Sequence, residues 1–313
     1  MVAPRLSLSA ADPIVQALKE YSPDIKNSET HLAGVLNQAV GNPGKLIRAR
    51  LVDAAATTHG MDRDGALQLA CAVEYFHLAS LLLDDLPCMD DAQTRRGRTC
   101  PHRVHGEAPT ILSSLALINR AYALAGFALA GEATQIRLAA MGCLDACLGV
   151  PGLVGGQARD LAFAESDRSA REVGRIAAAK TGALFWLAIY FPALLAEPDA
   201  EEGHHLKALC LYWGLAFQAM DDLGDLAITK SGENQGKTAG RDYSMTRPNL
   251  ALAMGEVATK RRVARLMVQA TRVLTKLTER RSSWFYLMNF HREYFEANVR
   301  LVLPEMEASS MAI

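Results

Sequence analysis

Long apolar segments with helical spacing constrain this chain more than any other feature. They cover residues 66–83, 111–129 and 206–226, where apolar side chains recur every three or four positions. Alanine and leucine dominate these segments, and the β-branched alternation typical of strands is almost absent. With 313 residues, of which 50% are hydrophobic, the chain is long enough to bury a large core. The sequence therefore predicts an all-α protein built as a single large helical bundle.

The charge balance argues against several classes of partner. Lysine and arginine total 33 against 34 acidic residues, so the net charge gives no reason to expect nucleic acid or an anionic membrane surface. The most apolar stretch, residues 181–196, is uncharged but contains Pro192, and it is shorter than the roughly 20 residues needed to cross a bilayer. We expect a buried helix there and no membrane span.

The beginning of the chain and its cysteines bear on location. Residues 1–7 lack the basic segment followed by a long apolar one that marks a secretory signal. The six cysteines include no Cys-x-x-Cys pair, which favours free thiols in a reducing compartment over a disulfide framework or a zinc site. We expect a cytoplasmic protein.

Between Glu74 and Gly97 an apolar helix runs directly into acidic residues. Asp84 and Asp85 close the helix, because Pro87 cannot donate to the backbone ladder and ends it. Asp90 then lies on a turn. On an unbroken helix it would point away from Asp84, so the break is what allows both carboxylates to surround one ion.

A second acidic cluster lies in the last apolar segment. Asp221 and Asp225 are four residues apart and therefore stack on one helical face, where like charges repel unless a cation neutralises them. Oxygen ligands without histidine or cysteine suit Mg²⁺. Either cluster alone is explained as a solvated helix end, but two such clusters favour a metal-binding function.

Basic residues that can hold phosphate are spread over the same regions. Arginine offers a forked pair of donors to phosphate, whereas lysine acts as a point charge. The candidates are Lys45, Arg48, Arg95, Arg96, Lys180, Lys237 and Arg241.

With these motifs the chain resembles the trans-prenyl diphosphate synthase family, which includes farnesyl and geranylgeranyl diphosphate synthases, over nearly its whole length. The family's first motif in its bacterial form, Asp-Asp-x-x-x-x-Asp followed by Arg-Arg-Gly, matches residues 84–97, and its second matches residues 221–225. Residues 43–48 match its Gly-Lys-x-x-Arg segment. The resemblance implies one polyprenyl synthase domain over residues 1–313, the isoprenoid synthase fold around a central substrate cavity, and a homodimer.

The resemblance also implies the reaction, a 1'-4 condensation of isopentenyl diphosphate with an allylic diphosphate, assisted by three Mg²⁺ ions. The released pyrophosphate takes the proton, so no protein base is required. The implied metal ligands are Asp84, Asp85, Asp90, Asp221 and Asp225, and the catalytic set is Asp84, Asp85, Asp90, Lys180, Asp221 and Asp222. The implied substrate-binding residues are Lys45, Arg48, His77, Arg95, Arg96, Lys180, Thr181, Gln218 and Lys237, with Gln157 and Asp160 as further candidates.

Product length depends on the residues before the first aspartates. In the family an aromatic residue near Ala79 commonly stops growth of the isoprenoid product at fifteen carbons. Ala79 and Ser80 are small, so we expect a longer isoprenoid chain to pass them. Tyr75 and Phe76 lie one turn deeper, about 5 Å, which indicates a C20 product, geranylgeranyl diphosphate. Ser113 and Ser114 depart from the family's usual Gly-Asp pair and affect the same space.

Three alternatives remain open from the sequence. A farnesyl diphosphate synthase would make a C15 product. A class I terpene cyclase would share the first aspartate motif, but it would carry an Asn-Ser-Glu type second motif and would not need Lys45, Arg48 or His77. A non-catalytic subunit of a heteromeric synthase typically loses an aspartate cluster, whereas both are present here.

Overall fold

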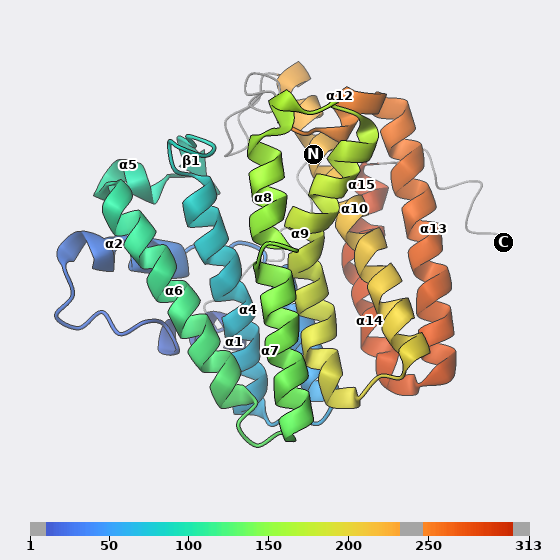
Figure 1. Ribbon diagram of the computed structural model, residues 1–313, viewed down its shortest axis with the longest axis horizontal. Coiled ribbons are helices and arrows are strands. Elements are labelled where there is room, and N and C mark those ends of the chain that lie inside the picture. The colour runs from blue at the N-terminus through green and yellow to red at the C-terminus, as the bar shows by residue number, and fades with distance from the viewer. Residues whose placement is uncertain (1–10, 232–246, 303–313) are drawn as a thin grey trace. The chain divides into compact units, whose positions relative to one another are not determined.

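The computed structural model describes residues 11–231 and 247–302 (Figure 1). In these residues helices account for nearly all regular structure, which confirms the predicted all-α class. The exception is an antiparallel hairpin of β1 (Thr94–Arg95) and β2 (Arg98–Thr99). The chain divides into two compact units, which we call the N-terminal unit, up to Arg137, and the C-terminal unit, from Leu138 onward. A single domain over residues 1–313 stays a prediction.

In the N-terminal unit, the long helices α4 and α6 run side by side (Figure 1), and α3 packs on α4 as well. The helices of this unit are α1 (Pro13–Glu20), α2 (Thr30–Val40), α3 (Ile47–Thr58), α4 (Arg63–Asp84), α5 (Pro101–His105) and α6 (Glu107–Ala128). The hairpin lies between α4 and α5 in the chain. The predicted helical segment 66–83 falls inside α4, and most of segment 111–129 falls inside α6.

Helix α4 begins at a capping aspartate and is then buried along its length. The Asp62 carboxylate accepts a hydrogen bond from the Gly65 amide at 2.7 Å, which satisfies one of the amides left open at the helix start. Burial extends over adjacent positions, including Leu69, Tyr75 and Phe76, so the helix contacts neighbours on several sides. A polar side chain in its interior is therefore buried unless it points to a cavity.

In the C-terminal unit, α9 and α13 both pack against α10, and α8 packs on α9. The α-helices are α7 (Thr134–Leu148), which begins just before the division, α8 (Leu153–Leu161), α9 (Ala170–Ala193), α10 (Ala200–Ser231), α12 (Leu250–Met254), α13 (Glu256–Arg280), α14 (Phe285–Phe290) and α15 (Ala297–Val302). Short 3₁₀ turns cover Phe163–Glu165, Leu194–Ala196 and Ser282–Trp284. The predicted buried helix at 181–196 consists of the end of α9 and the turn that follows it.

The core of the C-terminal unit is aromatic. The Trp213 ring stacks on Phe295 with 4.8 Å between ring centroids, and its indole nitrogen donates to His291 Nδ1 at 3.1 Å. His291 and Phe295 lie in a π-helical segment, His291–Glu296, which the sequence does not predict. The other two tryptophans, Trp186 and Trp284, belong to the same unit.

All six cysteines are free thiols, as the sequence predicts. Five are buried and Cys88 is exposed. Cys143 and Cys147 lie one turn apart on α7 with their sulfur atoms 3.9 Å apart, too far for a disulfide bond.

Four helical segments are long and apolar enough to cross a membrane by length and composition. In α4 and in residues 170–196, 67% and 61% of the most apolar window is buried inside the protein. In α6 and in residues 134–161 the buried shares are 33% and 28%, so most of each window lies at the surface. The absence of a membrane span therefore stays a prediction.

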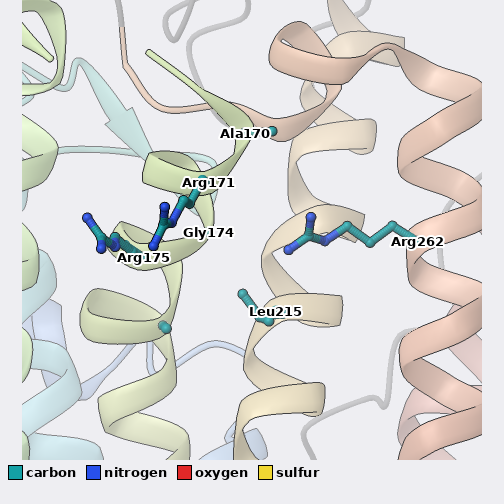
Figure 2. Close-up of a pocket in the computed structure, with 7 residues that line it drawn as sticks. Ala170, Arg171, Gly174, Arg175, Leu215 and Arg262 are labelled. Atoms are coloured by element: carbon teal, nitrogen blue, oxygen red, sulfur yellow. The ribbon is translucent and has the colours of Figure 1, made fainter. Parts of the chain in front are cut away.

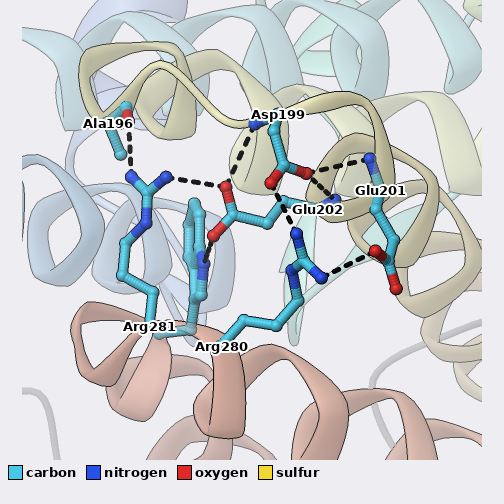
Figure 3. A network of polar contacts seen from close by, with 7 residues as sticks. Ala196, Asp199, Glu201, Glu202, Arg280 and Arg281 are labelled. Carbon is cyan, nitrogen blue, oxygen red and sulfur yellow. Dashed lines mark hydrogen bonds and ion pairs between the residues drawn. The ribbon is translucent and has the colours of Figure 1, made fainter.

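A buried carboxylate joins the start of α10 to the end of α13 (Figure 3). Glu202, whose side chain is 2% exposed, accepts from Arg281 at 2.7 Å and from the Trp284 indole at 2.9 Å. Outside this contact, Arg280 pairs with Asp199 and Glu201 at 2.6 Å each, at the surface. The carboxylate of the inner contacts is nearly excluded from water, whereas both carboxylates of the outer contacts are more than half exposed.

We expect Glu202→Ala to lower the free energy of unfolding by about 2–4 kcal/mol, because the buried Trp284 indole N–H loses its acceptor and Arg281 loses its ion pair, keeping its hydrogen bond to the Ala196 carbonyl. Arg280→Ala is the matched control and should have little effect, since its partners are solvent-exposed. Denaturant unfolding followed by circular dichroism measures both. Equal losses would contradict the assignment.

Candidate active site

The first acidic motif forms a compact turn at the end of α4. The Asp90 amide donates to the Asp84 carbonyl and the Ala92 amide to the Asp85 carbonyl, both at 3.0 Å. The chain therefore folds back onto the helix end directly after Pro87, as the sequence predicts. The side chains of Asp84 and Asp90 are half-buried.

Asp85 has a different environment from its neighbour. Its side chain is 2% exposed, and both of its oxygens accept from Arg95, from Nε at 2.8 Å and from Nη2 at 2.6 Å. Burial alone lowers the pKa of Arg95, but the hydrogen bonds to Asp85 and the charges of Asp85 and Asp84 outweigh burial and raise it. The pair ties the hairpin to the end of α4.

The next residue, Arg96, occupies the turn of the hairpin in the left-handed region, with φ 53°. Its Nη1 donates to the Asn42 carbonyl at 2.7 Å. A β-carbon on Gly44 would lie 2.4 Å from the Arg96 Cζ, and Gly44 itself has φ 77°. Only glycine at position 44 lets the guanidinium pack this closely against the loop before α3.

Arg48 and Arg96 both lie close enough to His77 for their charges to act on it. Arg48, in the first turn of α3, is 7% exposed, whereas Lys45 is exposed. Burial and the positive charges of Arg48, Arg96 and Arg95 lower the pKa of His77 well below 6.5. His77 is therefore a neutral imidazole at neutral pH. It can donate and accept hydrogen bonds, but it contributes no positive charge.

Glu74 also belongs to this group, although the sequence motifs did not select it. It is 1% exposed on α4, three residues before His77, and burial raises its pKa to about 7 against the opposing charges of Arg96 and Arg48. The sequence could have indicated Glu74 through its spacing from His77, because residues three positions apart share a helical face.

In the C-terminal unit, hydrogen bonds link α9, α10 and α12. Thr181 donates to Gln218 at 2.9 Å, and Gln218 donates to Asp222 at 2.8 Å. Asp222 also accepts from the Leu250 amide at 2.6 Å and is 1% exposed. The structure thus brings three predicted residues together, and it gives Asp222 contacts that hold helices in place.

The C-terminal unit also contains the second acidic pair, Asp221 and Asp225, and the predicted Lys180. Asp221 is exposed and Asp225 half-buried, one turn apart on α10 as predicted. Lys180 lies 3.3 Å from Asp160 of α8, whose backbone carbonyl accepts from Arg247 at 3.2 Å. Gln157 lies one turn before Asp160 on α8.

Two of the phosphate candidates, Lys237 and Arg241, lie outside the described residues. Over residues 11–231 and 247–302, no three His, Cys, Asp or Glu side chains converge as a preformed metal site.

A separate cavity of about 410 Å³ lies in the C-terminal unit and contains none of the predicted site residues. Arg171 and Arg175 of α9 and Arg262 of α13 line it, above Leu215 of α10 (Figure 2). We therefore assign the candidate site by its residues and not by this cavity.

Comparison with known proteins identifies the family. The polyprenyl synthetase family model matches residues 29–276. A geranylgeranyl diphosphate synthase of Pantoea ananas is 38% identical over 201 residues, which cover 64% of this chain and 66% of the relative. A geranylgeranyl diphosphate synthase of Pseudescherichia vulneris is 37% identical over 235 residues, covering 70% of this chain and 76% of the relative.

Solved structures agree with this assignment. An FPP/GFPP synthase from Zymomonas mobilis superposes with a TM-score of 0.75 at 28% identity, covering 90% of this chain and 95% of that one. A geranyltransferase from Helicobacter pylori, complexed with magnesium and isoprenyl diphosphate, has a TM-score of 0.79 at 23% identity, covering 90% and 94%, and supports the fold alone. With the family model matching most of its length, the chain belongs to the polyprenyl synthetase family of prenyltransferases, with their all-α isoprenoid synthase fold.

Proposed function

We propose that this protein is a trans-prenyl diphosphate synthase that joins isopentenyl diphosphate to an allylic diphosphate by 1'-4 condensation. One observation carries the proposal: the N-terminal unit contains two groups of side chains with different chemistry, one acidic and one cationic. The acids at the end of α4 suit a metal-bound diphosphate, whereas Arg48, Arg96 and neutral His77 suit a diphosphate without metal. A terpene cyclase has no use for the second site.

The residues of each acidic cluster fit Mg²⁺. Asp84 and Asp90 offer carboxylate oxygens at one turn, and Asp221 and Asp225 offer another pair on α10. Asp85 is committed to Arg95, so we assign it to holding that arginine rather than to the metal alone. Such sparse, all-oxygen sets suit an ion that keeps water and phosphate oxygens in its shell. We infer three ions with the bound diphosphate.

When bound, Mg²⁺ neutralises charge on the departing pyrophosphate. We assign the same role to two of the protein's own cations, Lys180, which Asp160 orients, and Arg95, which Asp85 orients. Thr181 and Gln218 fix each other across α9 and α10 and present a rigid polar edge to the substrate. The double bond of isopentenyl diphosphate forms the new C–C bond, and the proton it loses passes to pyrophosphate.

The environment of α4 supports a C20 product, in line with the names of the relatives. Ala79 is 1% exposed and leaves room for a growing chain. One turn deeper, the Phe76 ring meets Tyr122 of α6 edge-on, with 5.0 Å between centroids. Tyr75 instead donates to the Leu18 carbonyl at 2.5 Å. We therefore assign the floor of the channel to Phe76, which is 3% exposed.

Ser113 and Ser114 on α6 do not enter this assignment. Both are fully buried, and their hydroxyls donate to backbone carbonyls, of Leu32 at 3.5 Å and of Thr110 at 3.0 Å. Because these hydroxyls already donate to backbone carbonyls, they leave no unpaired polar group to oppose the passage of an apolar isoprenoid chain.

We also propose that the protein is a cytoplasmic homodimer that uses the outer face of α6. This face carries an apolar stripe that is 41–60% exposed and consists of Ile111, Leu112, Leu115, Tyr122 and Phe127. The exposed Asn119 interrupts the stripe, which suits a second copy of the chain better than lipid.

Purified protein with Mg²⁺, isopentenyl diphosphate and farnesyl diphosphate should release pyrophosphate and form geranylgeranyl diphosphate. Asp84→Ala and Asp221→Ala should each reduce the rate by at least about 100-fold, because charge neutralisation at the leaving group is worth several kcal/mol. Enzyme-coupled pyrophosphate detection measures the rate.

Asp91→Ala is the control, since Asp91 is exposed and pairs only loosely with Arg103 at 3.5 Å. It should retain activity, and all variants should keep their helical circular dichroism. Pyrophosphate released from an allylic substrate alone would indicate a cyclase, and none from any primer would exclude a synthase.

Substitutions at the channel should change product length in opposite directions. Ala79→Phe narrows the channel and should shorten the product to C15, whereas Phe76→Ala removes the floor and should yield products beyond C20. Tyr75→Phe, which loses only the hydrogen bond to Leu18, should leave the length unchanged. Mass spectrometry of the extracted products distinguishes these results, and identical products from all three would refute the channel.

Leu115→Asp should convert a dimer into a monomer, because it buries a charge in the apolar stripe. Val257→Asp is a matched control at a position that is 63% exposed on α13, and it should leave the dimer intact. Size-exclusion chromatography with light scattering gives the mass. A monomeric parent protein would rule out the dimer.

A further inference from the structure

Glu74 is a buried acid that the proposed reaction does not use. Its side chain is 1% exposed, and its Oε1 has no hydrogen-bond partner among the residues that the structure describes. Within the same ranges, no lysine or arginine nitrogen comes within the 4.0 Å of an ion pair with it. Burying an acid without partners is costly, so the position calls for an explanation.

The nearest cations are Arg48 of α3 and Arg96 of the hairpin, and their charges oppose the effect of burial on Glu74. Arg96 is held by Asn42 and by its packing against Gly44, so it cannot swing toward the acid without losing those contacts. The acid and the two arginines therefore act on one another through space and not through a direct ion pair.

The balance between burial and these cations brings the pKa of Glu74 to about 7. Near neutral pH the carboxyl is therefore present in both protonation states. A diphosphate on the arginines adds negative charge beside Glu74 and offsets the positive charge that stabilises its ionised form. Both changes favour the protonated acid.

Among the described residues, the two titratable neighbours of Glu74 on α4 do not titrate in the same range. His77 is kept neutral, and burial raises the pKa of Cys71 far above neutral. The pKa of Cys71 responds to the charges of Asp53 of α3, Glu20 of α1 and Arg120 of α6, but the pKa of Glu74 does not. No described residue of α2 shifts the pKa of Glu74.

We propose that Glu74 is an internal counter-ion of the Arg48–Arg96 pair, which takes up a proton from solvent when the diphosphate of isopentenyl diphosphate binds there. This inference rests on the proposed function for the identity of the anion. Glu74 is a positioning residue, because it acts through the arginines and touches no substrate. Its ionised form competes with the substrate for the same positive charge.

The proposal predicts that affinity for isopentenyl diphosphate falls as pH rises through 7. Between pH 6 and pH 8 the ionised fraction of Glu74 in the free protein grows. The parent protein's dissociation constant for isopentenyl diphosphate should therefore rise about tenfold more over this range than that of Glu74→Gln. The amide keeps the shape of the acid but carries no charge, so at pH 8 Glu74→Gln should bind the substrate more tightly than the parent.

Isothermal titration of the full-length protein with isopentenyl diphosphate alone, without a primer, tests this. Titrations at pH 7 in two buffers of different ionisation enthalpy count the protons taken up, and the substrate's own proton exchange is common to both proteins. We expect the parent to take up about half a proton more than Glu74→Gln. Asp64→Asn, the same change at an exposed position on α4, should behave as the parent.

Equal proton uptake and equal pH profiles for the parent and Glu74→Gln would overturn the proposal. So would weaker binding by Glu74→Gln at every pH, which indicates a purely structural role. Thermal melting at each pH checks folding, and the neutral amide should not lower the melting temperature at pH 8. Failure of the parent to release pyrophosphate in the synthase assay would overturn the proposed function, whereas the titration tests Glu74 independently.

Discussion

The bidentate ion pair between Asp85 and Arg95 fixes the architecture of the N-terminal part of the site. The Asp85 carboxylate is nearly excluded from water, and its pairing with Arg95 ties the hairpin to the end of α4, so the backbone after Arg95 has little freedom. Arg96 then emerges from a left-handed turn directly toward the loop that carries Gly44. A single desolvated pair thus determines where two consecutive arginines point, one toward the metal motif and the other toward the cationic site.

The long apolar segments made the helical class predictable. The spacing of apolar residues shows which face of a helix is buried, even when the residues that pack against that face are unknown. The acidic motifs were also readable, since Pro87 and the four-residue spacing of Asp221 and Asp225 act locally. What periodicity cannot give is the chemical state of a buried polar group. Whether Asp85 faces an ion or an arginine depends on a residue ten positions away.

The same limit explains why Glu74 escaped the motif search and why Asp222 looked equivalent to Asp221. Their difference lies in tertiary contacts: Asp222 accepts from Gln218 and from the start of α12, whereas Asp221 faces outward. The π-helical segment at His291 was equally unpredictable, since it is associated with the stacking of Trp213 on Phe295 and not with a local sequence signal.

The distribution of tryptophan gives the protein a built-in optical label. Because all three indoles reside in the C-terminal unit, two of them fully buried, fluorescence excited selectively at tryptophan records the melting of that unit. Far-ultraviolet dichroism records helices throughout the chain. Superimposed transitions would mean that the two units unfold as one cooperative body, and separated transitions would reveal which unit is the weaker.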